Sequence, residues 1–269
     1  MFRFSRIFTL TALLVSTTAT ANTALEQAVN NPLRTAEFTQ RDQYRNPVAT
    51  LNFFEVTPQS TVVEISPGAG WYTEILAPML AADGLYYAAH FPATATGFGQ
   101  RSRAAFMEKL AANPQYSKVQ VTEFAPTPGI SIAPAGSADV VLTFRNLHNW
   151  YMAGGEDALL TAFSHFYTAL KPGGVLGIVE HRLPEAKLSS DWSRSGYMPQ
   201  SLTIKLAEKA SFTFESSSEI NANPKDTADH PSGVWTLPPS LRLGEQDREK
   251  YLAIGESDRM TLKFRKPLN

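Results

Sequence analysis

Short runs of β-branched residues alternate along the chain with stretches of helical periodicity, and this alternation limits the possible folds more than any other feature. Apolar runs without polar alternation indicate strands buried on both faces, and helical stretches between them indicate crossovers between parallel strands. The sequence therefore predicts an open α/β sheet, mostly parallel, with helices on both faces. The seven predicted strands are residues 61–65, 85–89, 119–123, 139–144, 175–180, 212–220 and 259–265.

Four segments have the pattern of helices: residues 73–80, 100–112, 156–170 and 199–210. In the second of these, Ala104, Met107 and Leu110 share one face, which we expect to pack on the core. The third is followed by Lys171-Pro-Gly-Gly174, which ends a helix and turns the chain into the next strand. No crossover helix is evident between residues 212 and 265, so the last strand is expected to pair antiparallel with its neighbour.

The first 21 residues differ from the rest of the chain. They combine Arg3 and Arg6, a short apolar run and Ala19-Thr-Ala21, a pattern typical of a cleaved secretory signal peptide. The apolar run is shorter than the roughly 20 residues that a membrane span needs, so no span is expected after cleavage. Residues 22–59 are polar and predict a helical N-terminal preface or lid packed over one edge of the sheet, before a main domain of residues 60–269.

Composition excludes several kinds of site and partner. The chain has no Cys, which rules out disulfides, thiolate nucleophiles and cysteine-bound metals. Its 24 Lys and Arg balance 25 Asp and Glu without a long run of one sign, so nucleic acid is not an expected partner. The five His include no i, i+4 pair and no His-x-His, and we therefore expect no metal site.

A glycine-containing turn follows the first predicted strand, in Thr61-Val-Val-Glu-Ile-Ser-Pro-Gly-Ala-Gly-Trp-Tyr-Thr73. Gly68 and Gly70 allow the backbone to approach a ligand closely, and the helix that follows offers free N–H groups to it. A dinucleotide fingerprint would need a third Gly at the position of Thr73, and a P-loop would need a Gly-Lys-Ser/Thr sequence. A nicotinamide oxidoreductase is therefore the least favoured enzyme class.

Four segments in order resemble class I S-adenosylmethionine-dependent methyltransferases. They are the glycine turn, Asp139-Val-Val-Leu-Thr-Phe-Arg-Asn-Leu-His-Asn-Trp150, Ala169-Leu-Lys-Pro-Gly-Gly-Val-Leu-Gly177 and the closing strand at residues 258–266. The resemblance spans about residues 47–266 and implies a Rossmann-like fold with S-adenosylmethionine as cofactor. The sequence also resembles a group of exported bacterial methyltransferase-like proteins, which implies a periplasmic location and leaves the substrate open.

The resemblance implies a role for each matching residue of the cofactor site. Glu64 would orient the amino acid end of the cofactor, beside the backbone of the turn. His90 stands where a carboxylate usually binds the ribose, and Ser66 stands where many relatives have the first Gly. The full set of implied cofactor residues is Glu64, Ser66, Pro67, Gly68, Gly70, His90, Arg145 and Asn146.

Further polar residues follow the fourth and fifth predicted strands, and in a parallel sheet they converge on one rim. His148 is the first candidate for a catalytic base, followed by His181, with Asn149 beside them, because imidazole titrates near neutral pH. Either His could instead connect loops by hydrogen bonds. Glu180 beside Arg182 has the pattern of a structural ion pair.

Aromatic residues near this rim are candidates for the walls of a small-molecule pocket: Trp71, Tyr72 and Trp150. Residues 221–257 form a long, proline-rich excursion, which we interpret as a substrate lid that carries Lys225, His230 and Trp235. An alternative is that Trp235 only anchors the excursion on the core.

Two functions remain open at this stage. The first is a methyltransferase that acts on a small-molecule or protein acceptor. The second is an exported ligand-binding or accessory protein that keeps the fold without catalysis. Export favours the second, since S-adenosylmethionine is made in the cytoplasm, and so do the departures at Ser66 and His90.

Overall fold

A mostly parallel sheet runs through the centre of the molecule in a computed structural model that describes residues 23–268. The eight strands are β1 (Thr61–Ile65), β2 (Leu85–His90), β3 (Gln120–Glu123), β4 (Ala138–Phe144), β5 (Leu170–Leu183), β6 (Met198–Pro199), β7 (Thr213–Ser218) and β8 (Arg259–Arg265). Their order is β3-β2-β1-β4-β5-β8-β7, with the two-residue β6 paired to β5. The predicted α/β class is confirmed. The structure contains all seven predicted strands and one more, the short β6.

Strand direction follows the prediction. The pairs β2/β3, β1/β2, β1/β4 and β4/β5 are parallel, whereas β8 is antiparallel to both β5 and β7. Strand order reverses between β1 and β4, since the chain runs outward to β3 on one side and to β5 on the other. At such a reversal the loops after the two strands diverge and leave a crevice at their carboxyl ends.

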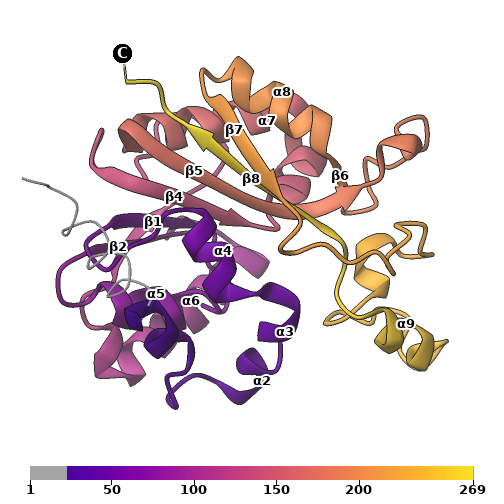
Figure 1. Cartoon of the computed structure of the whole chain (residues 1–269), viewed down its shortest axis with the longest axis horizontal. Coiled ribbons are helices and arrows are strands. Elements are labelled where there is room, and N and C mark those ends of the chain that lie inside the picture. Colours follow the sequence, from indigo (N-terminus) through magenta and orange to yellow (C-terminus); the bar gives the residue numbers. More distant parts are fainter. Residues whose placement is uncertain (1–22, 269) are drawn as a thin grey trace, which may run out of the picture.

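Helices cover both faces of the sheet (Figure 1). One face carries α5 (Thr73–Leu80) and α6 (Gly97–Ala112), and the other carries α7 (Leu147–Ala169) and α8 (Gln200–Lys209). Because β1 and β4 are buried on both faces, their apolar side chains belong to two separate cores, one on each face of the sheet. The three short 3-10 helices are η1 (Pro114–Tyr116), η2 (Glu185–Lys187) and η3 (Gly233–Thr236).

The inward face of α6 differs from the prediction. Phe106 is 1% exposed, whereas Met107 is 42% exposed. Most of α6 lies in solvent, and it is anchored where the Phe106 ring packs against His90, with ring centroids 5.0 Å apart. A helix attached through one large side chain has little apolar periodicity, so the sequence pattern could not identify that residue.

The N-terminal preface consists of a helix over residues 23–29 and of α2 (Ala36–Thr39), α3 (Asp42–Arg45) and α4 (Pro47–Phe53). The predicted position over a sheet edge is wrong. Leu51 and Phe54 belong to the same core as Val140 of β4 and Val175 of β5, so the preface covers the centre of one face. Gly177 of β5 makes room for it, because a Cβ at that position would lie 2.6 Å from the Phe54 ring.

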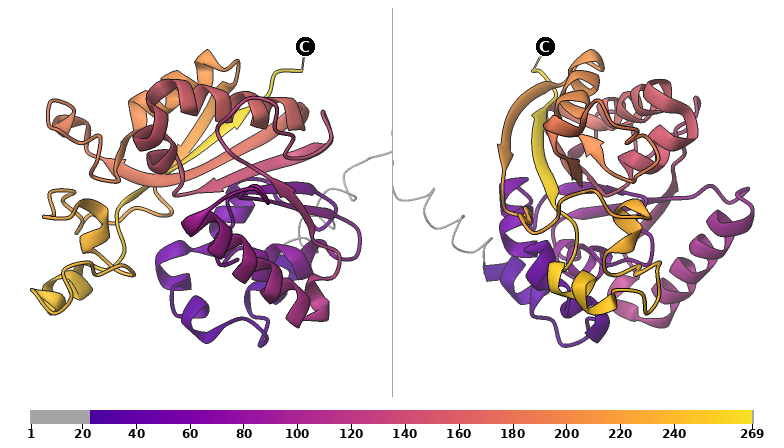
Figure 2. Two further views of the ribbon diagram at one scale, coloured as in Figure 1. Left: turned by 180° about the vertical axis from the view of Figure 1, so that it is seen from behind. Right: turned by 90° about the vertical axis from the view of Figure 1, so that its right-hand side faces the viewer.

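The excursion after β7 contains η3 and α9 (Arg248–Ile254) and lies at the same end of the molecule as the preface helices α2 and α3 (Figure 2). The two segments touch there, since Arg41 of the preface donates to Glu256. None of the described helices combines the length and the apolar character that a membrane crossing requires. The predicted signal peptide falls outside the described residues.

Candidate functional site

The turn between β1 and α5 is held in a strained backbone conformation. Ser66, Gly68 and Gly70 have φ values of 51°, 60° and 82°. These values lie in the left-handed region that glycine adopts most easily, so a Gly at the position of Ser66 would relieve steric strain. A Cβ on Gly68 would meet nothing within 4 Å, whereas one on Gly70 would contact Phe106 and Thr73. Gly68 therefore faces open space.

Glu64 ends β1 beneath this turn and is fully enclosed. Its carboxylate accepts hydrogen bonds from the Tyr86 hydroxyl and, at 3.5 Å, from Thr73 Oγ1. Burial raises the pKa of Glu64 to about 7, although Tyr86 and Arg145 act in the opposite direction. A cationic group placed next to Glu64 would favour its ionised form and release a proton.

His90 ends β2 and contacts the turn from below. The amide of Phe91 donates to His90 Nδ1 at 2.8 Å, which leaves Nε2 as the protonated nitrogen that meets the Gly68 carbonyl at 3.2 Å. Burial holds the pKa of His90 below its usual range. The structure thus uses His90 to support Gly68, and both of its ring nitrogens are occupied within the protein.

Two cavities open on either side of the turn. The apolar cavity has a volume of about 530 Å³ and is walled by Phe91, Phe98, Phe124, Pro126 and Trp150. The turn cavity has about 260 Å³ and is lined by Glu64, Trp71, Tyr72, Arg45 and Arg145, among others. Both are also lined by Ser66, Gly68 and Asn146, so the two cavities meet at the reversal of strand order between β1 and β4.

The predicted aromatic residues reach this region in different ways. Tyr72 stacks on Phe144 with centroids 3.6 Å apart, and the Trp71 indole donates to the carbonyl of Phe38 while the Arg45 guanidinium lies 4.6 Å from its ring centroid. Trp71 therefore ties the preface to the turn in addition to lining a cavity. Trp150 packs against Phe124 and presents part of its ring to the apolar cavity.

A third cavity, the arginine cavity, lies next to the turn cavity and has a volume of about 290 Å³. It is lined by Arg41, Arg45, Arg145, Arg259, Glu256, His148, Asn149, His181, Val234, Trp235, Pro238, Pro239 and Ser240. It shares Arg41, Arg45 and Arg145 with the turn cavity and Asn149 with the apolar cavity. The three cavities together form one candidate site.

His148 lies in the first turn of α7, a position that the sequence did not predict to be helical. Gly154 and Gly155 interrupt α7, and only the part from residue 156 onward was expected. His148 Nδ1 lies 2.9 Å from Glu180 Oε1. The main-chain N–H groups of Leu147 and His181 also donate to Glu180, so the carboxylate acts as acceptor and Nδ1 must carry the proton.

This arrangement leaves His148 Nε2 as the basic nitrogen of the ring, and His148 lines the arginine cavity. The expected ion pair between Glu180 and Arg182 does not form. Arg182 instead binds Asp258 and Glu219, while the carboxylate of Glu180 is occupied by His148 and by main-chain N–H groups. A buried carboxylate that orients an imidazole is the arrangement that prepares a histidine for proton abstraction.

His181 lies next to this pair, with its ring centroid 5.1 Å from that of His148. Its Nδ1 meets Ser257 Oγ at 2.5 Å. Burial, together with nearby His148 and Arg259, holds the pKa of His181 well below its usual range, so it stays neutral. Asn149 is exposed at the boundary between the apolar and arginine cavities.

His148, Glu180 and His181 also form a group whose ligand atoms all lie within 4.8 Å of one another. The sequence could not show it, because residues 148 and 180 are brought together by the pairing of β4 with β5. Both oxygens of Glu180 already accept N–H groups, so a metal ion would have to displace these hydrogen bonds.

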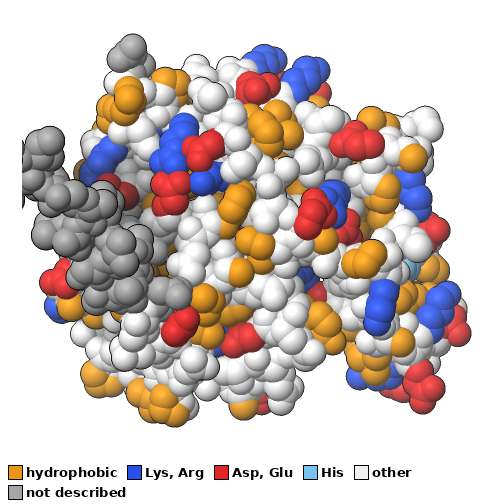
Figure 3. Space-filling view, in the orientation of Figure 1, with side chains coloured by type: hydrophobic (Ala, Val, Ile, Leu, Met, Phe, Trp, Pro, Cys, Tyr) orange, Lys and Arg blue, Asp and Glu red, His pale blue; other side chains and the backbone are white. Residues whose placement is uncertain are grey.

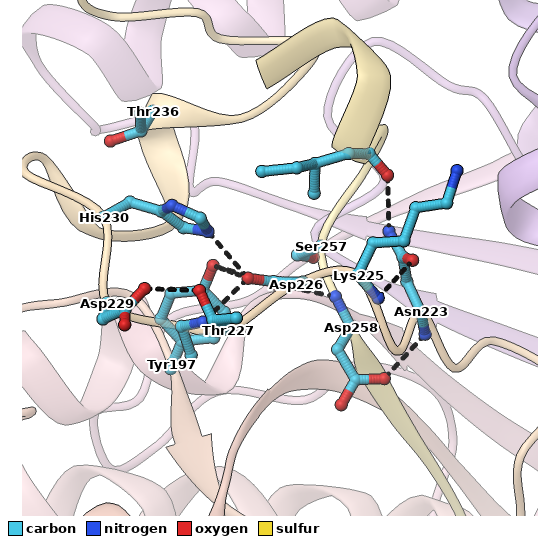
Figure 4. A network of polar contacts seen from close by, with 12 residues as sticks. Tyr197, Asn223, Lys225, Asp226, Thr227, Asp229, His230, Thr236, Ser257 and Asp258 are labelled. Atoms are coloured by element: carbon cyan, nitrogen blue, oxygen red, sulfur yellow. Dashed lines mark hydrogen bonds and ion pairs between the residues drawn. The ribbon is translucent and has the colours of Figure 1, made fainter. Parts of the chain in front are cut away.

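The excursion contributes only in part to the site. Trp235 of η3 lines the arginine cavity, with its ring 6.0 Å from that of His148. His230 does not reach the cavity, because its Nε2 binds Asp226 at 2.8 Å, as Figure 4 shows. Lys225 points away toward the Ala253 carbonyl and lines a separate cavity. The predicted substrate roles of Lys225 and His230 are therefore not supported by their positions.

Asp226, the partner of His230, has a structural role. It accepts hydrogen bonds from the Tyr197 hydroxyl and from the amide of Asp258, at the start of β8 (Figure 4). Burial alone would raise the pKa of Asp226, but its hydrogen bonds outweigh that effect and hold the pKa below its usual value. Asp226 thus connects the excursion to residues next to β6 and β8.

Arg145 was among the predicted site residues, but the other three arginines of the arginine cavity and the phenylalanines of the apolar cavity were not. Arg41 and Arg45 come from the preface, Arg259 begins β8 and Phe91 follows β2. The four arginines are scattered over more than 200 positions, so no sequence spacing connects them. The density of Arg in the preface, with Arg34, Arg41 and Arg45, was the one available signal.

Sequence comparison finds no match, either among protein-family models or among curated proteins. The structure, in contrast, superposes on solved structures. One is described as a SAM-dependent methyltransferase from Aquifex aeolicus, with a TM-score of 0.54, 13% identity and coverage of 91% of this chain and 98% of that chain. The chain has the class I methyltransferase fold.

Two further structures agree with that assignment. A putative sarcosine dimethylglycine methyltransferase from Galdieria sulphuraria gives a TM-score of 0.54 at 14% identity and covers 91% of this chain and 90% of its own. The [4+2]-cyclase SpnF gives 0.57 at 16% identity, with coverage of 94% and 96%. A cyclase on the same fold shows that the fold alone does not set the reaction, so the function must be argued from the site.

Proposed function

We propose that this protein is an S-adenosylmethionine-dependent methyltransferase. The observation that carries the proposal is the pair of cavities that meet at Ser66, Gly68 and Asn146. One cavity is apolar and the other is polar and charged, and they join at the reversal of strand order, where folds of this class bind ligands. A ligand with an aromatic base at one end and an amino acid at the other matches both.

The residues present fit this cofactor. The apolar cavity would take the adenine ring between Phe91, Phe98 and Phe124. In the turn cavity, the carboxylate of the cofactor would meet Arg145 and its ammonium group would meet Glu64. The side chain of Arg145 lines this cavity and forms no hydrogen bond with another of the described residues 23–268, and the space in front of Gly68 is open. The proposal thus accounts for both the unpaired side chain of Arg145 and the open space at Gly68.

The bound cofactor supplies a methyl group on a sulfonium, which passes to an acceptor oxygen or nitrogen while the electrons of the carbon–sulfur bond remain on sulfur. His148 Nε2 accepts the proton that the acceptor loses. Glu180 holds the His148 ring through Nδ1 and stabilises the imidazolium that forms. His181 stays neutral beside it and limits the charge near His148. Trp235 lines the same cavity, with its ring centroid 6.0 Å from that of His148.

Matched glycine substitutions test where the cofactor lies. Gly68 and Gly136 have φ values of 60° and 63°, and in both cases an added Cβ meets nothing within 4 Å. Alanine therefore costs a similar backbone strain at each position, about 1 kcal/mol. Only Gly68 lines the proposed cofactor site. We expect Gly68→Ala to weaken binding of S-adenosylhomocysteine about tenfold or more in isothermal titration calorimetry, and Gly136→Ala to leave it unchanged.

Equal affinities for the two variants would place the cofactor elsewhere. No binding to the wild-type protein at millimolar concentration would remove the proposed function. The alternative, a ligand-binding or accessory protein that keeps the fold without catalysis, predicts no transfer of a labelled methyl group, so a transfer assay on the same sample separates the two.

A further inference from the structure

The arginine cavity concentrates positive charge in a protein that is otherwise balanced. The whole chain has a formal net charge of −1, and on the face seen in Figure 3 basic and acidic side chains are interspersed. The cavity, in contrast, is lined by four arginines and one acid, a formal sum of +3. Such a concentration of one sign inside a cavity attracts the opposite charge.

The single acid is shared among three of these arginines. Arg41 Nε lies 2.5 Å from Glu256 Oε1, Arg45 Nε lies 3.6 Å from Oε2, and Arg259 binds Oε2 as well. Arg145 has no ion pair with any described residue. Glu256 therefore neutralises one charge of four, and the other three remain uncompensated.

Two arginines of this cavity also have a donor that lacks a hydrogen-bond acceptor within residues 23–268. Nε of Arg45 and Nε of Arg259 are buried without a hydrogen-bond partner among the described residues, and Arg45 is only 4% exposed. Burial, together with neighbouring arginines, lowers the pKa of Arg45 to about 8 and that of Arg145 to about 10. Unpaired donors of this kind are costly in the free protein and become favourable when an oxyanion binds them.

Cofactor binding does not remove this deficit. The methionine end of the cofactor brings one carboxylate to the turn cavity, but it also brings an ammonium and a sulfonium. The sum of charge around the reacting group therefore rises on cofactor binding. An anionic ligand in the arginine cavity would offset the positive charge that remains, and this cavity is also the one that His148 lines.

We propose that the methyl acceptor is a small organic acid whose carboxylate or phosphate group binds the partly exposed side chain of Arg41 in the arginine cavity, next to the buried Arg259. This rests on the proposed function. Arginine forks match the oxygens of either group. The ring of Trp235 and the prolines at 238 and 239 provide an apolar wall for the body of the acid, and the volume of about 290 Å³ suits a molecule about the size of one substituted ring. The acidic group would then hold the acceptor's hydroxyl or amine near His148.

The proposal is tested by binding rather than by turnover. The probes are 4-hydroxybenzoate, phenyl phosphate and the neutral phenol, titrated calorimetrically into the full chain saturated with S-adenosylhomocysteine at constant chloride concentration. We expect at least one of the two acids to bind and phenol to bind about tenfold more weakly or not at all. The acid that binds more tightly identifies the oxyanion as carboxylate or phosphate. Equal binding of phenol and both acids would overturn the proposal.

Variants show whether the arginines are responsible. Arg41→Gln removes a charge at a side chain that is 24% exposed. We expect it to weaken binding of the acid about tenfold or more, whereas Arg248→Gln, at an exposed arginine on α9, should leave it unchanged. Acid affinity that is unchanged in the Arg41→Gln variant would contradict the proposal.

Failure of this inference is distinguishable from failure of the proposed function, because the two ligands are titrated separately. Binding of S-adenosylhomocysteine without arginine-dependent binding of any acid would overturn the acid acceptor and leave the methyltransferase proposal intact. Arginine-dependent acid binding without S-adenosylhomocysteine binding would support the anion site and remove the methyltransferase proposal.

Discussion

Replacing His148 by Gln is expected to lower methyl transfer by a factor of about 10² to 10⁴, the usual contribution of a general base, with little change in affinity for S-adenosylhomocysteine. Gln keeps a polar group of similar size at the cavity but cannot take up a proton. His148 contacts the arginine cavity and not the two cavities proposed for the cofactor, so cofactor binding should persist. The readout is tritium transferred from labelled S-adenosylmethionine to a small-molecule extract.

His165→Gln is the matched control, because His165 also lies on α7 and binds the carbonyl of Thr127 but lines none of the three cavities. It should transfer label at the wild-type rate. A His148→Gln variant with transfer within twofold of wild type would show that the acceptor needs no base at this position, and the role of the Glu180 pair would then be structural.

Replacing Glu256 by Gln is expected to reduce the free energy of unfolding by about 3 to 5 kcal/mol at pH 7. Glu256 is 2% exposed and is the acid that Arg41, Arg45 and Arg259 share. Without its charge, buried guanidinium groups face one another unpaired. Urea unfolding measures the change, and Glu245→Gln, at a side chain that is 91% exposed, should change the free energy of unfolding by less than about 0.5 kcal/mol.

The stabilities of the wild-type and Glu256→Gln proteins should also respond differently to acid. Burial alone would raise the pKa of Glu256, but Arg259 and Arg45 lower it to about 2, below its ordinary value of 4.5. A folded pKa below the unfolded one stabilises the protein above pH 4.5, and this stabilisation is lost as pH falls from 4.5 to 2. The Glu256→Gln deficit should therefore shrink over that range. A deficit independent of pH would mean that the ion pairs are not its source.

Much of the fold could be predicted because the central strands β1 and β4 are apolar runs and strand order follows from crossovers. β1 and β8 begin and end at the predicted residues. The failures are of one physical kind. The first turn of α7 was missed because Gly154 and Gly155 separate it from the periodic part, and Phe106 was missed because one side chain anchors α6. Both depend on tertiary contacts that leave no periodic signal.

The site was predictable where one turn or one strand end carries it. Gly68, Asn146 and His148 follow β1 and β4, and parallel pairing brings them to one edge. The arginine cavity was not predictable, since its charges come from the preface, the β4 loop and the start of β8. Lys225 and His230 looked chemically suited to a lid, yet their partners Ala253 and Asp226 lie within the excursion itself. Residue type alone did not reveal those partners.

A crystal structure with S-adenosylhomocysteine tests the central claim most directly. The account predicts density for the adenine ring among Phe91, Phe98 and Phe124, with the backbone of Gly68 against the ligand and the amino acid end beside Glu64 and Arg145. Crystals grown at millimolar ligand in which this space is filled by the protein's own side chains, with no ligand density across the turn, would contradict it.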